Sequence, residues 1–231
     1  MQFRDRKHAG MLLAQKFAEL SFDKKNTIVI ALPRGGVPVA HEIAKALHLP
    51  LDIILVKKIG APTYPELAIG SLSEDDEEFY NKDLLAELGY KLSDIDPIKE
   101  QALIKLQEIG TALRQGHRPL SLTNKNIIVV DDGIATGATM EVVIQVLKKR
   151  KVRKIIIAVP VSSADTMTTL SKEVDKFIVV MTPTPLYSIG EWYENFIQVE
   201  TEEVIKILKE YSSAYKKPSK FNKDHNHSDI S

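Results

Sequence analysis

Two kinds of hydrophobic pattern alternate along the chain. Short continuous apolar runs rich in Ile and Val are typical of strands that are buried on both faces of a parallel sheet. Between them, apolar residues recur every three or four positions, which predicts amphipathic helices. The predicted strands are 27–32, 51–56, 126–131, 154–161 and 176–181, and the predicted helices are 4–20, 36–48, 138–150, 163–172 and 201–211. This order indicates parallel βαβ units, so we expect an α/β fold with a Rossmann-like parallel sheet flanked by helices.

The alternation is interrupted between Lys57 and Leu122. Loop signals lead into ELAIGSLS, a candidate short strand, and the stretch 84–114 is mainly helical. A break at GYKLSDIDP precedes a second helix, for which Pro97 is suited to be the first residue. From these breaker signals we expect a helical insertion of roughly 50 residues, about 73–122, that forms a lid. Its charged residues are more typical of a solvated face than of ligands: Glu100, Lys105, Arg114, His117 and Arg118.

Composition and charge narrow the class of protein. The 31 basic and 31 acidic residues cancel, so bulk charge does not favour a nucleic-acid partner. The absence of cysteine excludes disulfides, thiol nucleophiles and zinc–thiolate sites. No signal-peptide core is visible near the N-terminus, and no apolar run approaches the ~20 residues that span a bilayer. We therefore expect a cytoplasmic protein with no membrane partner, made of one domain (1–211) and a polar tail (212–231) that is disordered.

Candidate chemistry lies where the apolar run at 127–130 ends. It stops at Asp131 and Asp132. Burying two adjacent carboxylates at the end of a strand costs free energy unless a cation or hydroxyl groups bind to them. The small residues 136–139 follow, with hydroxyl and backbone N–H donors, directly before a predicted helix. Because a helix N-terminus is an anion site, the stretch predicts a place where a sugar and a phosphate lie side by side. The loops PRGG and KKIGAP follow two other predicted strands, so we expect all three at one edge of the sheet.

The stretch VVDDGIATGAT resembles the phosphoribosyl-pyrophosphate (PRPP) binding motif of the type I phosphoribosyltransferases. The segments FRDRKHAG, ALPRGGVPVA, KKIGAPTYPELAIG and GEWYENF resemble a family of uncharacterised proteins in that superfamily, and the resemblance covers about residues 3–211. It implies the type I phosphoribosyltransferase fold with a C-terminal hood at 182–200, and it is compatible with a homodimer.

The resemblance also implies roles for the motif residues. Asp131 and Asp132 would accept hydrogen bonds from the ribose hydroxyls and would bind Mg²⁺ directly or indirectly. Helix capping by one of them is an alternative. The 5′-phosphate would be held by Ala135, Thr136, Gly137, Ala138 and Thr139, and the leaving pyrophosphate by Arg34, Gly35, Gly36, Lys57 and Lys58. Catalysis would rest on Asp131, Asp132, Arg34 and Lys58. Arg34 could instead offer only its backbone N–H, and the two glycines could simply turn the chain into a helix. Relatives hold the peptide that matches Pro33–Arg34 in cis.

The expected activity is a Mg²⁺-dependent transfer of the phosphoribosyl group from PRPP to a small-molecule acceptor, a nucleobase or an amine. Ala135 stands where relatives that use 6-oxopurines carry an acidic residue, which weakens an assignment to hypoxanthine or guanine. Trp192 is the candidate for stacking on an acceptor, with core packing as the alternative. A second hypothesis is a regulatory protein that senses PRPP without transferase activity.

Overall fold

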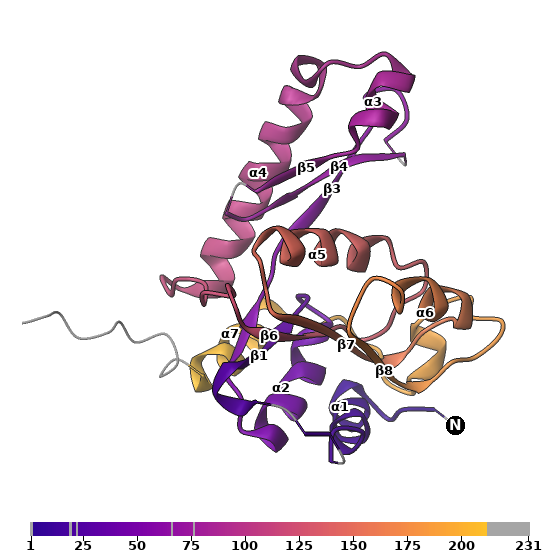
Figure 1. Cartoon of the computed structure of the whole chain (residues 1–231). Coiled ribbons are helices and arrows are strands. Elements are labelled where there is room, and N and C mark those ends of the chain that lie inside the picture. Colours follow the sequence, from indigo (N-terminus) through magenta and orange to yellow (C-terminus); the bar gives the residue numbers. More distant parts are fainter. Residues whose placement is uncertain (1, 19, 22, 66, 76, 212–231) are drawn as a thin grey trace, which may run out of the picture.

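The fold is described from a computed structural model, which places residues 2–18, 20–21, 23–65, 67–75 and 77–211 (Figure 1). The expected disorder of the tail at 212–231 lies outside the described residues. No helix in these ranges is long and apolar enough to cross a membrane.

A five-stranded parallel sheet forms the centre of the molecule and confirms the predicted α/β class. Its strand order is β2-β1-β6-β7-β8, and all neighbouring pairs are parallel. The strands are β1 (Thr27–Ala31), β2 (Leu51–Ile53), β6 (Asn126–Val130), β7 (Lys154–Val161) and β8 (Lys176–Met181). The helices are α1 (Arg6–Gln15), α2 (Gly36–Leu47), α5 (Ala138–Lys149), α6 (Ala164–Leu170) and α7 (Thr201–Glu210), with short 3₁₀ helices at Lys24–Asn26 and Gly190–Trp192.

Alternate residues of each strand pack into different cores, because successive side chains in a strand point to opposite faces. Val29 and Ile128 belong to the core beneath α1, α2 and α7. Ile28 and Ile127 belong to the core beneath α5 and α6. The sheet is therefore covered by helices on both faces, as Figure 1 shows for α5 on one side and for α1 and α2 on the other.

The insertion begins before residue 73 and is only partly helical, unlike the helical lid predicted at about 73–122. It contains a second, antiparallel sheet of β3 (Val56–Gly60), β4 (Ala68–Ser73) and β5 (Glu78–Tyr80), followed by α3 (Lys82–Leu88) and α4 (Leu92–Arg114). The expected strand at 51–56 is thus two strands in two different sheets. Ile59, Ile69 and Leu72 are fully buried and belong to the same hydrophobic core as the residues beneath α1, α2 and α7, so the small sheet shares the core of the main sheet.

The break between the two insertion helices lies within the predicted GYKLSDIDP stretch, but it is shorter than expected. Gly89 ends α3 in the left-handed conformation at φ 73°, which a residue without a Cβ adopts most easily. Pro97 lies inside α4 and not at its first residue.

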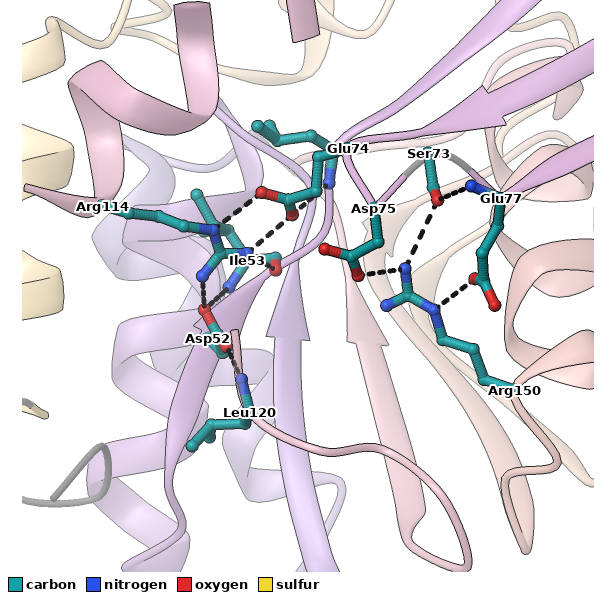
Figure 2. A network of polar contacts seen from close by, with 10 residues as sticks. Asp52, Ile53, Ser73, Glu74, Asp75, Glu77, Arg114, Leu120 and Arg150 are labelled. Atoms are coloured by element: carbon teal, nitrogen blue, oxygen red, sulfur yellow. Dashed lines mark hydrogen bonds and ion pairs between the residues drawn. The ribbon is translucent and has the colours of Figure 1, made fainter. Parts of the chain in front are cut away.

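Two sets of ion pairs, one buried and one partly exposed, connect the insertion to the main domain (Figure 2). Arg114, the last residue of α4, donates to Asp52 Oδ1 at 2.6 Å, and it donates to both Glu74 carboxylate oxygens at 2.8 and 2.7 Å. Arg150, at the end of α5, donates to Glu77 at 2.6 Å and to Asp75 at 2.7 Å. Arg114 is 7% exposed, so its expected place on a solvated face was wrong. Its charge is tolerated inside because two carboxylates surround it.

Candidate active site

The PRGG loop and the acid pair meet because their strands are neighbours. β1 pairs with β6 so that Ala31 lies opposite Val130, and the backbone N–H of Leu32 donates to Val130 O at 2.9 Å. A Cβ atom added at Gly36 would lie 2.7 Å from Val130 O, and one added at Gly35 would collide with Asp132 Oδ2. The two glycines therefore let the loop approach the acid pair closely. The Pro33–Arg34 peptide is cis, as expected.

Two adjoining cavities open at this edge of the sheet. The larger has a volume of about 550 Å³, and Pro33, Arg34, Asp131 and Thr139 line one side of it. Its other walls come from residues 54–56, from α4 and from Thr201. The smaller, of about 120 Å³, is surrounded by residue 131 and residues 133–140. Asp131 and Thr139 line both cavities, so a ligand that extends from one into the other passes these two residues.

The loop around the smaller cavity is held by the next βα unit. Thr166 Oγ1 donates to Ala135 O at 2.7 Å, and Ser163 Oγ donates to the same oxygen at 3.4 Å. Gly137 precedes α5 with φ 83° and without a side-chain cap on the helix, and a Cβ atom there would lie 2.8 Å from Thr166 Cγ2. Thr136 and Thr139 are exposed. The start of α5 thus presents backbone N–H groups and two hydroxyls to an incoming anion.

The acid pair is electrostatically unfavourable in the ligand-free protein. Burial and the neighbouring Asp132 charge raise the pKa of Asp131 well above its ordinary value. Burial also raises the pKa of Asp132, while a hydrogen bond from Arg6 opposes this increase. The Asp132 backbone N–H donates to Asp131 Oδ1 at 2.8 Å and partly compensates the burial of that carboxylate. Such a site favours a ligand that brings hydroxyl donors or a cation.

Two partners of Asp132 were missed by the residue-level sequence reasoning. Arg6 Nε donates to Asp132 Oδ2 at 2.8 Å, and the Tyr193 hydroxyl donates to Asp132 O at 2.6 Å. These contacts are 126 and 61 residues apart in the chain, so no local spacing pointed to them. The only signal was that both residues lie in segments that carry the resemblance, FRDRKHAG and GEWYENF.

Six predicted site residues do not line either cavity: Asp132, Gly35, Gly36, Lys57, Lys58 and Trp192. Trp192 packs in the cluster around Phe3 and Tyr193, which favours the core-packing alternative over stacking on an acceptor. Lys57 and Lys58 lie in β3 opposite Leu72 and Ser71 and alternate in direction, while the neighbouring Val56 does line the larger cavity. Their pyrophosphate-binding role stays a prediction.

A magnesium ion would find only part of its coordination here. Among the residues the structure places, no group of three or more His, Cys, Asp or Glu side chains could hold a metal ion by itself. Asp131 nevertheless lines both cavities. Because Mg²⁺ is usually bound by one or two carboxylates together with substrate phosphates, this donor set fits an ion that arrives with its substrate.

The sequence model of the phosphoribosyl transferase domain matches residues 4–203. The chain belongs to this family. Two curated relatives from Mycobacterium tuberculosis, from strains CDC 1551 / Oshkosh and H37Rv, are each 38% identical over 206 residues, and their names assign them provisionally as phosphoribosyl transferases. These matches cover 89% of this chain and 46% of each relative, so the chain spans about half the length of the curated relatives it matches.

A crystal structure of a Thermus thermophilus protein is similar to the phosphoribosyl transferase domain along nearly its whole length. The sequence identity is 34% and the TM-score 0.83, and the alignment covers 91% of this chain and 99% of the other. The predicted superfamily and fold are confirmed. The Asp131–Asp132 pair and the PRGG loop lie within the matched residues of the phosphoribosyl transferase domain.

Proposed function

We propose that this domain transfers a 5-phosphoribosyl group from PRPP to a nucleobase or amine and releases pyrophosphate. The observation that carries this proposal is that Asp131 and Thr139 line both cavities. The smaller cavity, at the start of α5, suits a terminal phosphate, and the larger one, with Arg34, suits a second anionic group. A phosphorylated sugar that carries a pyrophosphate has its charged groups in this order.

The residues supply positioning and charge compensation, which suffice for displacement at an anomeric carbon. The 135–139 loop would hold the 5′-phosphate, and Asp131 would accept hydrogen bonds from the ribose hydroxyls. Arg34 and the backbone N–H groups of Gly35 and Gly36 would bind the leaving pyrophosphate. Mg²⁺, bound with PRPP, would neutralise part of the charge that builds on the leaving group. No covalent nucleophile is needed for this reaction.

A second candidate, a PRPP-binding protein without transferase activity, is favoured by the packing of the hood on the acid-pair loop. Side-chain atoms of Ile189 would lie 2.6 and 2.8 Å from a Cβ atom at Gly133, and Tyr193 is buried directly beside Asp132. These residues fill space next to the acid pair, whereas Arg34 lines the open cavity. If the hood stays closed, an acceptor has little room to reach the sugar there.

A panel of nucleobases and amines with radiolabelled PRPP and Mg²⁺ separates the two candidates. Pyrophosphate release and acceptor-independent hydrolysis should be scored in the same reactions. A transferase releases pyrophosphate only with its acceptor and forms a labelled product. PRPP binding without any release supports the second candidate, and failure to bind PRPP rejects both.

A further inference from the structure

Arg6 connects the acid pair to the C-terminal hood. Its Nε donates to Asp132 Oδ2 at 2.8 Å, and its Nη1 donates to the backbone oxygen of Ile197 at 2.7 Å. Its guanidinium carbon lies 3.9 Å from the centre of the Phe196 ring, a cation–π distance. The side chain is only 11% exposed, so it is held on several sides at once.

The position of Arg6 in its own helix does not explain its burial. It is the first residue of α1, and a positive charge at a helix N-terminus is unfavourable because of the helix dipole. Asp5 caps this helix by accepting from the His8 N–H at 2.7 Å, so Arg6 is not needed as a cap. Its contacts with Asp132 and the hood are therefore the reason for its place.

The N-terminal segment and the hood also bind each other through their backbones. Phe3 and Tyr193 form a parallel β-bridge, and the Glu194 N–H donates to Phe3 O at 2.8 Å. The Tyr193 hydroxyl then donates to Asp132 O. Asp132 is consequently held by its main chain from the hood and by its side chain from α1.

The two carboxylates of the acid pair are thus placed differently. Asp131 lines both cavities, whereas Asp132 directs Oδ2 to Arg6 and lies against Gly35 of the PRGG loop. We propose that Arg6 is a positioning residue for sugar binding. It compensates the Asp132 charge and ties the hood to it, and so it keeps the backbone at 131–132 in the geometry that receives the ribose. This inference rests on the proposed function, because it assumes that the ligand carries a ribose.

The test compares Arg6→Gln and Arg6→Lys with Arg4→Gln, which removes the same charge from an exposed site two residues earlier. Ribose 5-phosphate and inorganic pyrophosphate are titrated separately into each folded variant in the presence of Mg²⁺. Loss of a charge-assisted hydrogen bond should lower the ribose 5-phosphate affinity of Arg6→Gln by about tenfold or more. Its pyrophosphate affinity should fall less, because Arg6 contacts the acid pair directly and reaches the PRGG loop only through the packing of Asp132 against Gly35.

Arg6→Lys should recover part of the lost affinity, since Lys keeps the charge but lacks the planar group that binds Asp132, Ile197 and Phe196 together. If Arg6→Gln fails to fold, Arg6→Lys takes its place in the test, and it should also lose more affinity for ribose 5-phosphate than for pyrophosphate. Unchanged ribose 5-phosphate affinity in Arg6→Gln would overturn the inference. Equal loss of both ligands would also overturn it, because that result indicates a general structural defect.

Hydrogen exchange of the ligand-free protein separates this inference from the proposed function. If the wild type binds neither ligand, the proposed function fails, but the link between Arg6 and the hood is still measurable. Residues 190–197 should exchange faster in Arg6→Gln than in Arg4→Gln. Equal protection of this segment in the two variants would rule out the link.

Discussion

Replacement of Arg114 by Met should weaken the attachment of the insertion to the main sheet. Met has a similar length and fills the space, but it leaves the Asp52 and Glu74 carboxylates buried without a cation. These side chains are 2% and 8% exposed. Burial opposes the charge of Arg114, yet hydrogen bonds to Glu74 and the charge of Asp52 outweigh it and raise the pKa of Arg114 above its ordinary value.

The expected cost follows from this burial. Breaking a buried ion pair by removing one partner typically costs about 3–5 kcal/mol. For a chain of this size, each kcal/mol lowers the midpoint temperature by roughly 2–4 °C. Arg150→Met is the matched control, since its partners Asp75 and Glu77 are 44% and 26% exposed and each such pair contributes at most about 1 kcal/mol.

The assay is urea unfolding followed by far-UV circular dichroism, with thermal melts as a second measure. Arg114→Met should be the more destabilised variant by at least about 1 kcal/mol, since its cost begins at about 3 kcal/mol and the two partly exposed pairs of Arg150 together contribute at most about 2 kcal/mol. Adding Asp52→Asn and Glu74→Gln should restore much of the loss, because the uncompensated charges are then gone. Equal stability of Arg114→Met and Arg150→Met would refute the reasoning.

Three further predictions concern the candidate site. Gly137→Ala should lower the free energy of unfolding by about 1–2 kcal/mol because of its positive φ alone, and it should also weaken PRPP binding in calorimetry. Gly89→Ala, at φ 73° in open space, should lower only the stability. Equal losses of PRPP affinity in the two variants would mean that the 135–139 loop is only a connector. Gly35→Ala should cost about 1–3 kcal/mol in urea unfolding because its methyl group collides with Asp132, and an unchanged midpoint would contradict that contact. Folding raises the pKa of Asp131, so the folded chain binds more protons than the unfolded chain, and its stability should fall as pH rises from about 4 through the raised pKa. Asp131→Asn should therefore melt at a higher temperature than wild type at neutral pH, and its stability should depend less on pH. A lower melting temperature for this variant would contradict the prediction.

The parts of the fold that follow from local pattern were predicted well. The run from Ile127 to Val130 has no polar residue, so its burial on both faces in β6 is readable from the sequence. The loop that follows β6 ends at α5 as predicted, because Gly137 and a periodic apolar pattern mark that boundary.

The remaining features depend on contacts between distant residues. The strand β3 carries Lys57 and Lys58, and its burial comes from pairing with β4 and not from its own composition. The sequence alone places Arg114 on the surface, because its partners Asp52, 62 residues away, and Glu74 come close to it only in the folded chain. Arg6 is similar, since its partner Asp132 is brought near only when α1 and the hood pack together. Hydrophobic periodicity carries no information on such charge pairs.

Titration of PRPP and Mg²⁺ into the ligand-free protein by calorimetry measures whether this edge of the sheet binds the proposed substrate. Asp131→Asn is the test variant, and Asp165→Asn, an exposed acid on α6, is the matched control. We expect wild type and Asp165→Asn to bind one PRPP per chain with equal affinity, and Asp131→Asn to lose about tenfold or more in affinity, as expected for hydrogen bonds to a charged group. Absence of binding to the wild type, or equal affinity in a folded Asp131→Asn, would contradict the claim that this edge of the sheet is a phosphoribosyl site.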